Sequence, residues 1–583
     1  MAKKSIDRAA LIAAIRELKE LSNEQKSDIL QLISEQKKYG IVWEDSPEEV
    51  EENLRNNVPV LVEDKDKAIV SNIDDAPNHI LIEGDNLEAL TALSYTHEGK
   101  IDVIYIDPPY NTGNKDFRYN DSFVDSEDGY RHSKWLSFME KRLKIAKKLL
   151  SDKGVIFISI DDNEQANLKL LCDEVFGEKH FIANLVWQKK FSRSNDALYF
   201  STMHDHILCY CRYTIQENQN SWKIGLLDRE GEIPKGYSNP DNDKRGVWTS
   251  TILSAKSGSS SLLYDITTPS GRIVTPPNGR YWSCSKETFL KWKSEGKIWF
   301  GKDGNGSPRK KTFLSEVQAG LRPNTLILEK QGGNNQDGKQ ELKAIFNGEG
   351  IFDGPKPTKL INLLLRIANS KSATILDFFA GSGTTLHATM QLNAEDGGHR
   401  QCILCTNNEN NICEEVTYER NKRVINGYTT PKGVEVEGLH DNSLRYYKIE
   451  DVPRDSSTTG LKKLMLASTD LLCIKNDLYE EQSVFGNIKL RKNIARYFDD
   501  GKQKMLIIYK VDAIESIVEE IKKMPDDTFI KVYVFSTNNY AMDADFEEVR
   551  DKVFLCALPA AIYNAYRKVL PRKNNVITEE EEV

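Results

Sequence analysis

The chain has 583 residues, of which 39% are hydrophobic, 29% charged and 9% aromatic, and its formal net charge is −9. This composition is ordinary for a soluble globular protein, and the length suggests roughly three or four domains. No apolar run approaches the ~18 residues of a membrane helix, and the amino-terminal residues lack the apolar core of a signal peptide, so the sequence predicts a cytoplasmic protein without membrane contact.

The amino-terminal residues 5–40 are predicted to form a helical hairpin. Apolar residues recur at helical spacing, Ser22-Asn23-Glu24-Gln25 has the form of a capping box, and Gly40 is placed to end the second helix. Residues 45–78 are acidic and are expected to be irregular.

An alternation of strand-like and helical patterns follows. Apolar strand-like runs separated by helical periods predict a parallel sheet covered by helices on both faces. The expected strands are 80–82, 101–106, 154–160 and 206–210, and the expected helices are 130–150 and 165–176.

Residues from about 190 to 345 are different, because they are rich in Gly, Ser, Pro, Asn and aromatic residues and show few helical periods. They predict a loop-rich insertion with short strands. The α/β alternation then resumes with a helix at 358–368, a strand at 373–377, a helix at 384–392 and a strand at 401–406. A separate β-α-β-like region, residues 505–535, precedes a charged end.

The first candidate motif is Asp107-Pro108-Pro109-Tyr110, directly after the predicted strand 101–106. Ligands of open α/β sheets bind beyond the carboxyl ends of strands, and two prolines hold the backbone stiff and extended there. A carboxylate and a proline carbonyl can each accept one hydrogen of an amine, and an aromatic ring can stack on a flat heterocycle. Both acceptors favour a pyramidal nitrogen and accommodate developing positive charge, as amine methylation of a flipped base requires. The alternative is a rigid turn without chemistry.

The second motif is a glycine-rich turn between a predicted strand and a predicted helix, a place where a ligand can approach the backbone closely. It lacks the lysine of a phosphate-binding loop, so a nucleoside without a polyphosphate chain fits it better. The turn comprises Asp377, Phe378, Phe379, Ala380, Gly381, Ser382, Gly383 and Thr384.

Acidic residues after two other strands support a nucleoside site. Asp85 follows the strand 80–82 and is placed to accept from an adenine amine. Glu409 follows the strand 401–406 and is the candidate for the ribose hydroxyls. Each of them could equally cap a helix.

Together these motifs resemble the amino-methyltransferases of DNA, and the Asp-Pro-Pro-Tyr form is typical of adenine-N6 enzymes. The order of catalytic motif, variable region and cofactor motif resembles the beta-ordered group, a circular permutation of the methyltransferase domain. The resemblance implies a Rossmann-like α/β fold whose strand 373–377 lies beside the strand 101–106. It also implies S-adenosylmethionine as methyl donor, with no metal expected.

Further segments resemble the modification subunit of type III restriction-modification systems. They are 39–44, 277–282 and 299–301, and the chain between the two motifs is the target-recognition domain in that family. Pro355-Lys356-Pro357 resembles the family's motif near the methionine end of the cofactor, so Lys356 is a candidate cofactor-binding residue. Implied partners are double-stranded DNA, a second copy of the chain and a helicase-nuclease restriction subunit.

The resemblance implies five domains: an amino-terminal helical region (1–60), a catalytic half of the methyltransferase domain (61–190), a target-recognition domain (191–345), a cofactor-binding half (346–445) and a small α/β carboxyl-terminal domain for dimerisation or partner contact (446–583). Two alternatives stay open. One is a solitary enzyme acting on cytosine-N4, and the other is a catalytically silent subunit that only recognises DNA.

Net charge and the cysteines give two further expectations, one for DNA contact and one for metal binding. A local basic face would suffice for phosphate contact, and Lys189-Lys190 with Arg193 and Arg309-Lys310-Lys311 are candidates. The nine cysteines include the close pairs Cys209/Cys211 and Cys402/Cys405, but no further pair or clustered histidine completes a zinc set. The sequence predicts buried reduced thiols and no metal site.

Overall fold

A computed structural model describes most of the chain beyond the amino-terminal region. The described residues are 43, 46–113, 117–119, 122–124, 128–193, 197–229, 233–317, 320–455, 457–536, 542–558, 562 and 564. The predicted amino-terminal hairpin lies outside them. The chain divides into one compact unit of residues Met1–Lys223 with Thr325–Val583 and a second unit of residues Ile224–Asn324.

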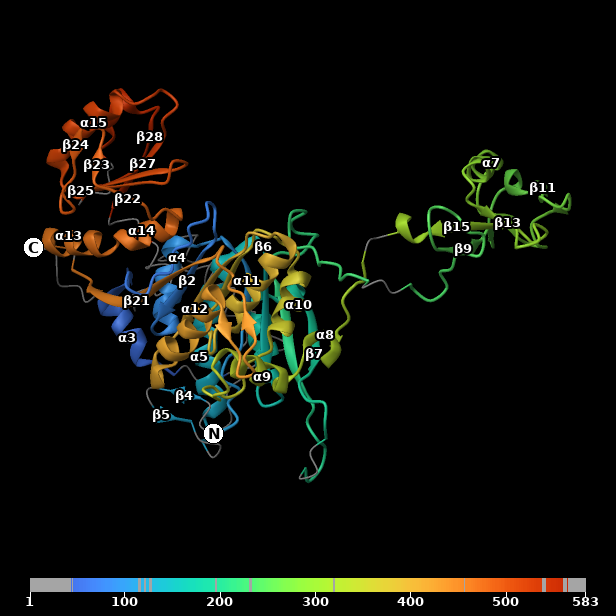
Figure 1. Cartoon of the computed structure of the whole chain (residues 1–583), viewed down its shortest axis with the longest axis horizontal. Coiled ribbons are helices and arrows are strands. Elements are labelled where there is room, and N and C mark those ends of the chain that lie inside the picture. The colour runs from blue at the N-terminus through green and yellow to red at the C-terminus, as the bar shows by residue number, and fades with distance from the viewer. Residues whose placement is uncertain are drawn as a thin grey trace, which may run out of the picture. The chain divides into compact units, whose positions relative to one another are not determined.

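The first unit is built on a sheet of ten described strands (Figure 1). In spatial order they are β1 (Asn57–Glu63), β21 (Ser443–Pro453), β2 (Asn78–Glu83), β18 (Gln401–Thr406), β17 (Thr374–Asp377), β3 (Ile101–Ile106), β6 (Leu150–Ile160), β8 (His204–Cys211), β7 (Phe181–Gln188) and β16 (Leu326–Ile327).

Helices pack against this sheet in two sets. One set comprises α4 (Asn86–Thr96), α5 (Arg131–Leu149) and α6 (Gln165–Phe176), and the other comprises α8 (Glu329–Gly332), α9 (Asn335–Ile345), α10 (Thr358–Ala368), α11 (Thr384–Asp396) and α12 (Glu419–Asn426). The predicted α/β fold class is confirmed. Strands β3 and β18 and helices α6 and α10 match the predicted ranges residue for residue.

The centre of the sheet is parallel, from β21 through β6, as the apolar runs predicted. The sheet is not parallel at its two sides, which the predicted parallel sheet did not anticipate. β8 pairs antiparallel with both β6 and β7, and β1 pairs antiparallel with β21. Apolar runs mark burial on both faces of a sheet but do not distinguish strand direction.

The two halves of the permuted sheet close in space. Ile375 and Leu376 of β17 pair in parallel with Val103 and Ile104 of β3. The Thr374 amide also donates to the Asp102 carboxylate at 3.1 Å. The predicted neighbourhood of these two strands is therefore confirmed.

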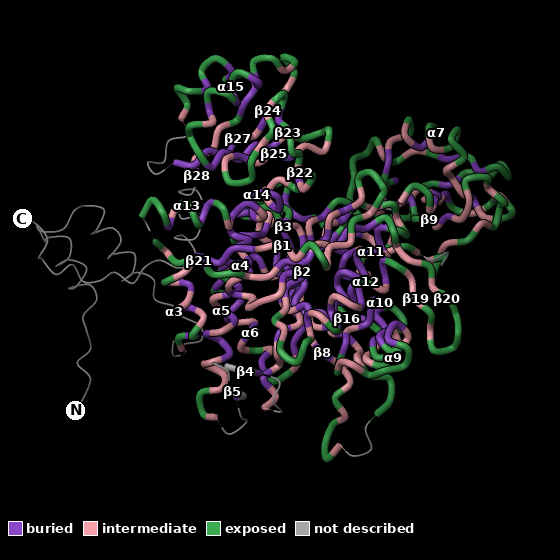
Figure 2. The backbone as a smooth tube through the Cα atoms, turned by 60° about the vertical axis from the view of Figure 1, so that its left-hand side comes forward, coloured by how far each residue is buried: buried purple, intermediate pink, exposed green. Residues whose placement is uncertain are grey.

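Alternating side chains of the central strands divide the core between the two faces of the sheet. Ile104, Ile106, Ile403 and Cys405 belong to one apolar cluster with the buried residues of α4, α5 and α6. Their neighbours along the strands, such as Tyr105, are also buried and point to the other face, because side chains alternate along a strand. Figure 2 shows this buried centre in purple.

Of residues 45–78, expected to be irregular, 64–77 do lack a helix or strand, but 49–63 form regular structure, contrary to expectation. Helix α3 (Glu49–Asn56) begins with a capping box between Glu48 and Glu51, and β1 follows it. β1 pairs with β21, which follows all the other strands of the main sheet in the chain. The apolar run of β1 was the available signal, but it is flanked by acidic residues and contains Pro59.

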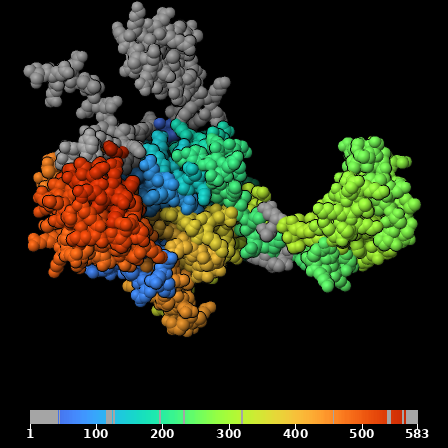
Figure 3. Space-filling model, turned by 90° about the horizontal axis from the view of Figure 1, so that it is seen from above, coloured from blue at the N-terminus to red at the C-terminus, as the bar shows by residue number. Residues whose placement is uncertain are grey.

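The second unit has short strands, as the sequence predicted, and one α-helix, α7 (Lys286–Ser294), among its described residues (Figure 3, green). Its small core contains Trp282, Phe289 and Phe300. The strands are β9 (Trp248–Ile252), β10 (Ser254–Ala255), β11 (Ile266–Thr267), β12 (Ile273–Val274), β13 (Tyr281–Trp282), β14 (Ile298–Trp299) and β15 (Arg309–Phe313).

The carboxyl-terminal region forms a second, five-stranded sheet with helix α15 (Ile514–Lys522) and its own apolar core. The β-α-β-like pattern predicted at 505–535 is confirmed, since β26 and β27 are parallel and flank α15. The strands are β22 (Glu481–Gln482), β25 (Ala495–Asp499), β26 (Lys504–Ile508), β27 (Ile530–Phe535) and β28 (Val553–Leu558).

Short elements complete the fold. They are the hairpins β4 (Arg118–Tyr119) with β5 (Ser122–Phe123), β19 (Tyr428–Thr429) with β20 (Glu435–Val436) and β23 (Val484–Phe485) with β24 (Ile488–Lys489), and the helices α13 (Thr458–Ala467) and α14 (Thr469–Asn476). The nine cysteines form no disulfide and all but Cys556 are buried, as predicted. Among the described residues, no helix has the length and apolar character needed to cross a membrane.

Candidate active site

The two motifs meet at one edge of the main sheet. β3 and β17 are parallel neighbours, so their carboxyl ends lie side by side and carry Asp107 and Asp377. Burial raises the pKa of Asp377 to about 7, and the nearby charge of Asp107 adds to this rise. Segments far apart in the chain therefore form one site in space.

Two hydrogen bonds hold the Asp107–Tyr110 segment in place: one comes from α5, and the other is made by Asn111, the residue that follows the segment. The buried Trp135 indole donates to the Pro109 carbonyl at 2.8 Å. Asn111, which has a positive φ of 57°, turns the chain away and donates to Glu164 at 2.5 Å. Two prolines and these two anchors fix the direction of the Asp107 and Tyr110 side chains.

Lys356 is the principal partner of this segment. Its ammonium group forms an ion pair with Oδ2 of Asp107 and lies 5.2 Å from the centroid of the Tyr110 ring. The Lys356 side chain is only 10% exposed. Among the described residues, Oδ1 of Asp107 and the Tyr110 hydroxyl are buried without a well-formed hydrogen bond. Buried polar atoms of this kind point to a missing ligand or water.

Glu164 is a buried anchor that the sequence analysis missed. Besides Asn111, it binds Nδ1 of His132 at 2.6 Å and the Asn167 amide at 2.8 Å. Its side chain is fully buried. It follows β6 within Asp161-Asp162-Asn163-Glu164, and this acidic run at a strand end was the available signal.

A second buried ion pair borders the site. Lys189 at the end of β7 binds Asp205 of β8 at 2.5 Å, and both side chains are largely buried. Burial raises the pKa of Asp205, while the Lys189 and Lys356 cations oppose that rise. The sequence suggested Lys189 as part of a basic face, but its ammonium group is largely buried and its charge is balanced by the Asp205 carboxylate.

The glycine-rich turn is shaped by Asp377 and by two glycines with positive φ, Gly381 (48°) and Gly383 (72°). Asp377 accepts from the Phe379 amide at 3.0 Å and from the Thr385 hydroxyl at 2.5 Å. Its carboxylate therefore ties the turn to the start of α11, and the turn presents backbone to a ligand.

Arg420 supports the same turn from behind. This buried residue of α12 donates to the hydroxyls of Thr384 at 2.7 Å and Ser382 at 3.1 Å. Burial lowers the pKa of Arg420 to about 10. The Ser382 and Thr384 hydroxyls therefore accept hydrogen bonds from Arg420 inside the protein. The spacing of the motif did not predict this contact.

Asp85 and Glu409 lie at the same sheet edge, after β2 and β18 respectively. Asp85 caps α4 through the Leu87 amide at 2.7 Å and lies 3.6 Å from the buried Arg142, with 40% of its own side chain exposed. Glu409 is exposed. Asp85 therefore caps the helix, as the sequence suggested, and its exposed part can also contact a ligand.

The phenylalanines of the turn have different environments. Phe378 is buried in the core beside α5 and Phe379 is half-buried, with their ring centroids 5.3 Å apart. The Ala380 amide donates to the Cys405 carbonyl at 3.1 Å. These contacts seat the turn on the neighbouring strand β18.

The raised pKa of Asp377 predicts a pH dependence of stability. A carboxyl whose folded pKa lies above its unfolded value stabilises the fold at low pH, and this contribution is lost as pH rises from about 4 to about 7. In urea titrations across this range, the wild type should lose stability relative to Asp377→Asn by at most about 1.4 kcal/mol per pH unit. If the free energy of unfolding changed with pH equally in the two proteins, this expectation would be contradicted.

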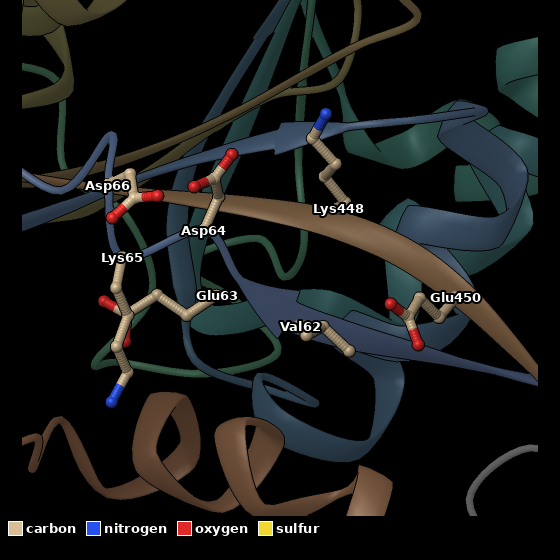
Figure 4. A pocket seen from close by; sticks show the side chains of 7 residues that line it. All are labelled: Val62, Glu63, Asp64, Lys65, Asp66, Lys448 and Glu450. Atoms are coloured by element: carbon tan, nitrogen blue, oxygen red, sulfur yellow. The ribbon is translucent and has the colours of Figure 1, made fainter.

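Two further features bear on the expected DNA-binding and ligand-binding surfaces. Lys311 of the Arg309–Lys311 cluster is buried and paired with Asp241 and with Asp243, the latter at 3.1 Å, so it is not part of a solvated basic face. A shallow hollow lies along β1 and β21 (Figure 4) and contains none of the candidate site residues. It is lined by Val62, Glu63, Asp64, Lys65, Asp66, Lys448 and Glu450.

Comparison with known proteins gives a family match and several relatives. The model of the N6_N4_Mtase family, described as DNA methylase, matches residues 101–419. The StyLTI Mod subunit, a type III restriction-modification enzyme subunit from Salmonella typhimurium strain LT2, is 38% identical over 353 residues, covering 56% of this chain and 52% of the relative. The EcoPI Mod subunit of Escherichia phage P1 is 32% identical, covering 57% of this chain and 58% of the relative. The chain thus spans about half the length of these relatives.

A type II enzyme and two solved structures are also similar. The type II methyltransferase M.KpnI of Klebsiella pneumoniae is 32% identical over 399 residues, covering 65% of this chain and 92% of the relative. The PvuII DNA methyltransferase, specific for cytosine-N4, covers 60% of this chain and 90% of its own at 12% identity and a TM-score of 0.32. The M1.HpyAVI–SAM complex covers 59% and 98% at 14% identity and a TM-score of 0.28.

Proposed function

The chain belongs to the N6_N4_Mtase family of DNA methylases, and from this membership we propose that it transfers a methyl group from S-adenosylmethionine to N6 of an adenine in double-stranded DNA. The observation that carries the proposal is Oδ1 of Asp107 at the end of β3, which is buried without a well-formed hydrogen bond to any described residue, beside Tyr110 and next to the glycine-rich turn.

The proposed role of Asp107 and Pro108 is to accept the two hydrogens of the target amine. Trp135 already occupies the Pro109 carbonyl, so we assign the second acceptor to the Pro108 carbonyl. Two fixed acceptors concentrate the nitrogen lone pair and stabilise the charge that develops on nitrogen during transfer. Tyr110 would stack on the base, which must leave the DNA helix to reach this site.

The residues around the glycine-rich turn fit S-adenosylmethionine. The turn approaches a ligand with backbone at Gly381 and Gly383, it contains no lysine, and carboxylates at positions 85 and 409 lie at the same edge. This set suits a cationic nucleoside better than a polyphosphate. When bound, S-adenosylmethionine supplies an electrophilic methyl group; Asp85 and Glu409 would hold its adenine amine and ribose hydroxyls.

Lys356 acts as a positioning residue in this proposal, rather than as the cofactor contact that its motif suggested. Its ammonium group holds Oδ2 of Asp107, which leaves Oδ1 to receive the target amine. Lys356→Met should therefore lower the rate of methyl transfer on the order of 10²-fold, because a misplaced acceptor raises the barrier, while cofactor affinity stays within a few-fold.

Single-turnover transfer rates and equilibrium cofactor binding, measured on the same Lys356→Met preparation, separate the two roles. A weaker cofactor affinity with an unchanged rate at saturation would assign Lys356 to the cofactor instead. Lys359→Met, one turn along in the exposed part of α10, is the matched control and should change neither quantity.

We also propose that residues Ile224–Asn324 read the DNA sequence and that the chain works as a dimer with a restriction subunit. The position of this unit between the two motifs and the similarity to a protein named as a Mod subunit support this assignment. Light scattering of the purified chain tests the dimer. A co-encoded helicase-nuclease that fails to co-purify with it would favour a solitary enzyme.

The central experiment uses methyl-labelled S-adenosylmethionine, DNA of mixed sequence and nucleoside analysis of the product. N6-methyladenine is expected. N4-methylcytosine would overturn the adenine assignment while preserving the enzyme class. Cofactor binding without label in any DNA, including native genomic DNA with the partner chain added, would favour a catalytically silent recognition subunit.

A further inference from the structure

Outside the methyl-transfer site, two imidazoles and a carboxylate meet beside strand β8. We propose that His204, His206 and Asp162 bind one divalent transition-metal ion, for which Zn²⁺ is the probe. One ligand atom from each residue lies within 4.8 Å of the others. The sequence predicted no metal site, because no set of closely spaced cysteines and histidines was complete; the carboxylate of Asp162 comes from a different part of the chain.

The fold places these three side chains together in a specific way. His204 and His206 are two residues apart on β8, so their imidazoles lie on the same face of the strand, with ring centroids 5.1 Å apart. Asp162 lies two residues beyond the end of β6, whose Ile160 pairs with His206 across the antiparallel ladder. Nε2 of His206 lies 3.0 Å from Oδ1 of Asp162.

The geometry and the ligand types suit a transition metal. Zn²⁺ takes histidine nitrogen and carboxylate oxygen at about 2.0–2.2 Å, so two donors on one ion are themselves about 3–3.5 Å apart. Mg²⁺ and Ca²⁺ prefer all-oxygen sites, whereas a pair of imidazoles favours zinc and related first-row ions. Three protein ligands leave at least one coordination position for water.

Asn184 supplies the outer contact that a metal-binding histidine needs. Its side-chain amide meets Nδ1 of His206, with the amide oxygen at 3.3 Å and the amide nitrogen at 3.0 Å. When the oxygen accepts the Nδ1 proton, Nε2 carries the free lone pair and points toward Asp162 and the ion. Such outer contacts fix both the tautomer and the ring orientation of a ligand.

The proposed ion has a structural role next to the active site. It would join the carboxyl end of β6 to the beginning of β8, which also carries Asp205 between the two histidines. Asp205 points to the opposite face, where it pairs with Lys189 and interacts electrostatically with Asp107. A metal at this place would hold one wall of the site without touching the reacting atoms.

The test measures metal binding by the full chain, free of any histidine tag and stripped with EDTA, by equilibrium dialysis against Zn²⁺ and elemental analysis. One Zn²⁺ per chain is expected. His204→Ala, His206→Ala and Asp162→Asn should each abolish stoichiometric binding, and Asn184→Ala should weaken it about 10–100-fold. His440→Ala removes an exposed histidine outside the cluster and should leave binding unchanged.

Thermal unfolding separates loss of the site from loss of the fold. With EDTA, the variants should unfold close to the wild type. Added Zn²⁺ should raise the Tm of the wild type and of His440→Ala, should raise that of Asn184→Ala only at higher Zn²⁺ concentration, and should leave the three ligand variants unchanged. Substoichiometric binding by the wild type, or equal losses in His206→Ala and His440→Ala, would overturn the proposal and leave a plain His–Asp hydrogen bond. The readout does not use methyl transfer, so it stands apart from the proposed function.

Discussion

Asp107→Ala should reduce methyl transfer by at least about 10²–10³-fold, the loss seen when one preorganised hydrogen-bonding group of an active site is removed. The variant deletes the acceptor Oδ1 and the partner of Lys356, and leaves Lys356 as a largely buried, unpaired cation. Among the described residues, the Asp107 carboxylate is hydrogen-bonded to Lys356 and not to the glycine-rich turn. Cofactor affinity should therefore stay within a few-fold.

The measurement is a single-turnover transfer of labelled methyl groups at saturating cofactor, together with equilibrium binding of the cofactor. Asp527→Ala, which removes an exposed carboxylate of the carboxyl-terminal region, is the control and should retain full activity. A near-normal rate in Asp107→Ala would refute the catalytic assignment. Loss of both rate and cofactor binding would instead indicate that the sheet edge has collapsed.

Gly383→Ala should weaken cofactor binding more than tenfold and destabilise the fold by about 1–3 kcal/mol. Gly383 has a φ of 72° at the start of α11, and a Cβ atom there would collide with the Asn421 amide and lie 3.1 Å from the methyl group of Thr417. Because Asn421 and Thr417 support the turn from behind, the turn itself would have to move toward the ligand.

Gly397→Ala is a closely matched control, since it lies at the other end of the same helix. Gly397 also has a positive φ, 64°, but nothing lies within 4 Å of the position of its Cβ atom. This variant should cost about 1–2 kcal/mol from backbone strain alone and leave cofactor affinity unchanged. Calorimetric titration and urea unfolding of both variants check the pair; equal cofactor affinities would contradict the assigned role of the turn.

The parts of the fold that could be predicted are those whose information is local. β3, β18, α6 and α10 have clear periodicity and recognisable ends. That β17 lies beside β3 was not a local inference; it was implied by the resemblance to permuted methyltransferases. β1 was missed although residues 58–62 are an apolar, β-branched run, because acidic residues surround it and Pro59 interrupts it; a proline is compatible with β1 as an edge strand.

The candidate site divides in the same way. Asp107, Tyr110 and the glycine-rich turn follow strands and carry their own signal, whereas the contacts that orient them join distant residues. Lys356 reaches Asp107 across 249 positions of sequence, and Arg420 reaches the turn from a helix whose pattern shows only burial. The proposed metal site depends on the antiparallel pairing of β6 with β8, which apolar runs did not reveal.

The strand order has a consequence for how the protein is made. β2 and β3 are consecutive long strands of the main sheet, yet β18 and β17 separate them in space, and β17 begins only at Thr374. A ribosome adding roughly 5–20 residues per second needs tens of seconds to reach these central strands. During that interval the early strands have unpaired inner edges, which are prone to wrong pairing. The nascent chain should therefore depend on chaperones until the last strand, β21, has emerged and closed against β1.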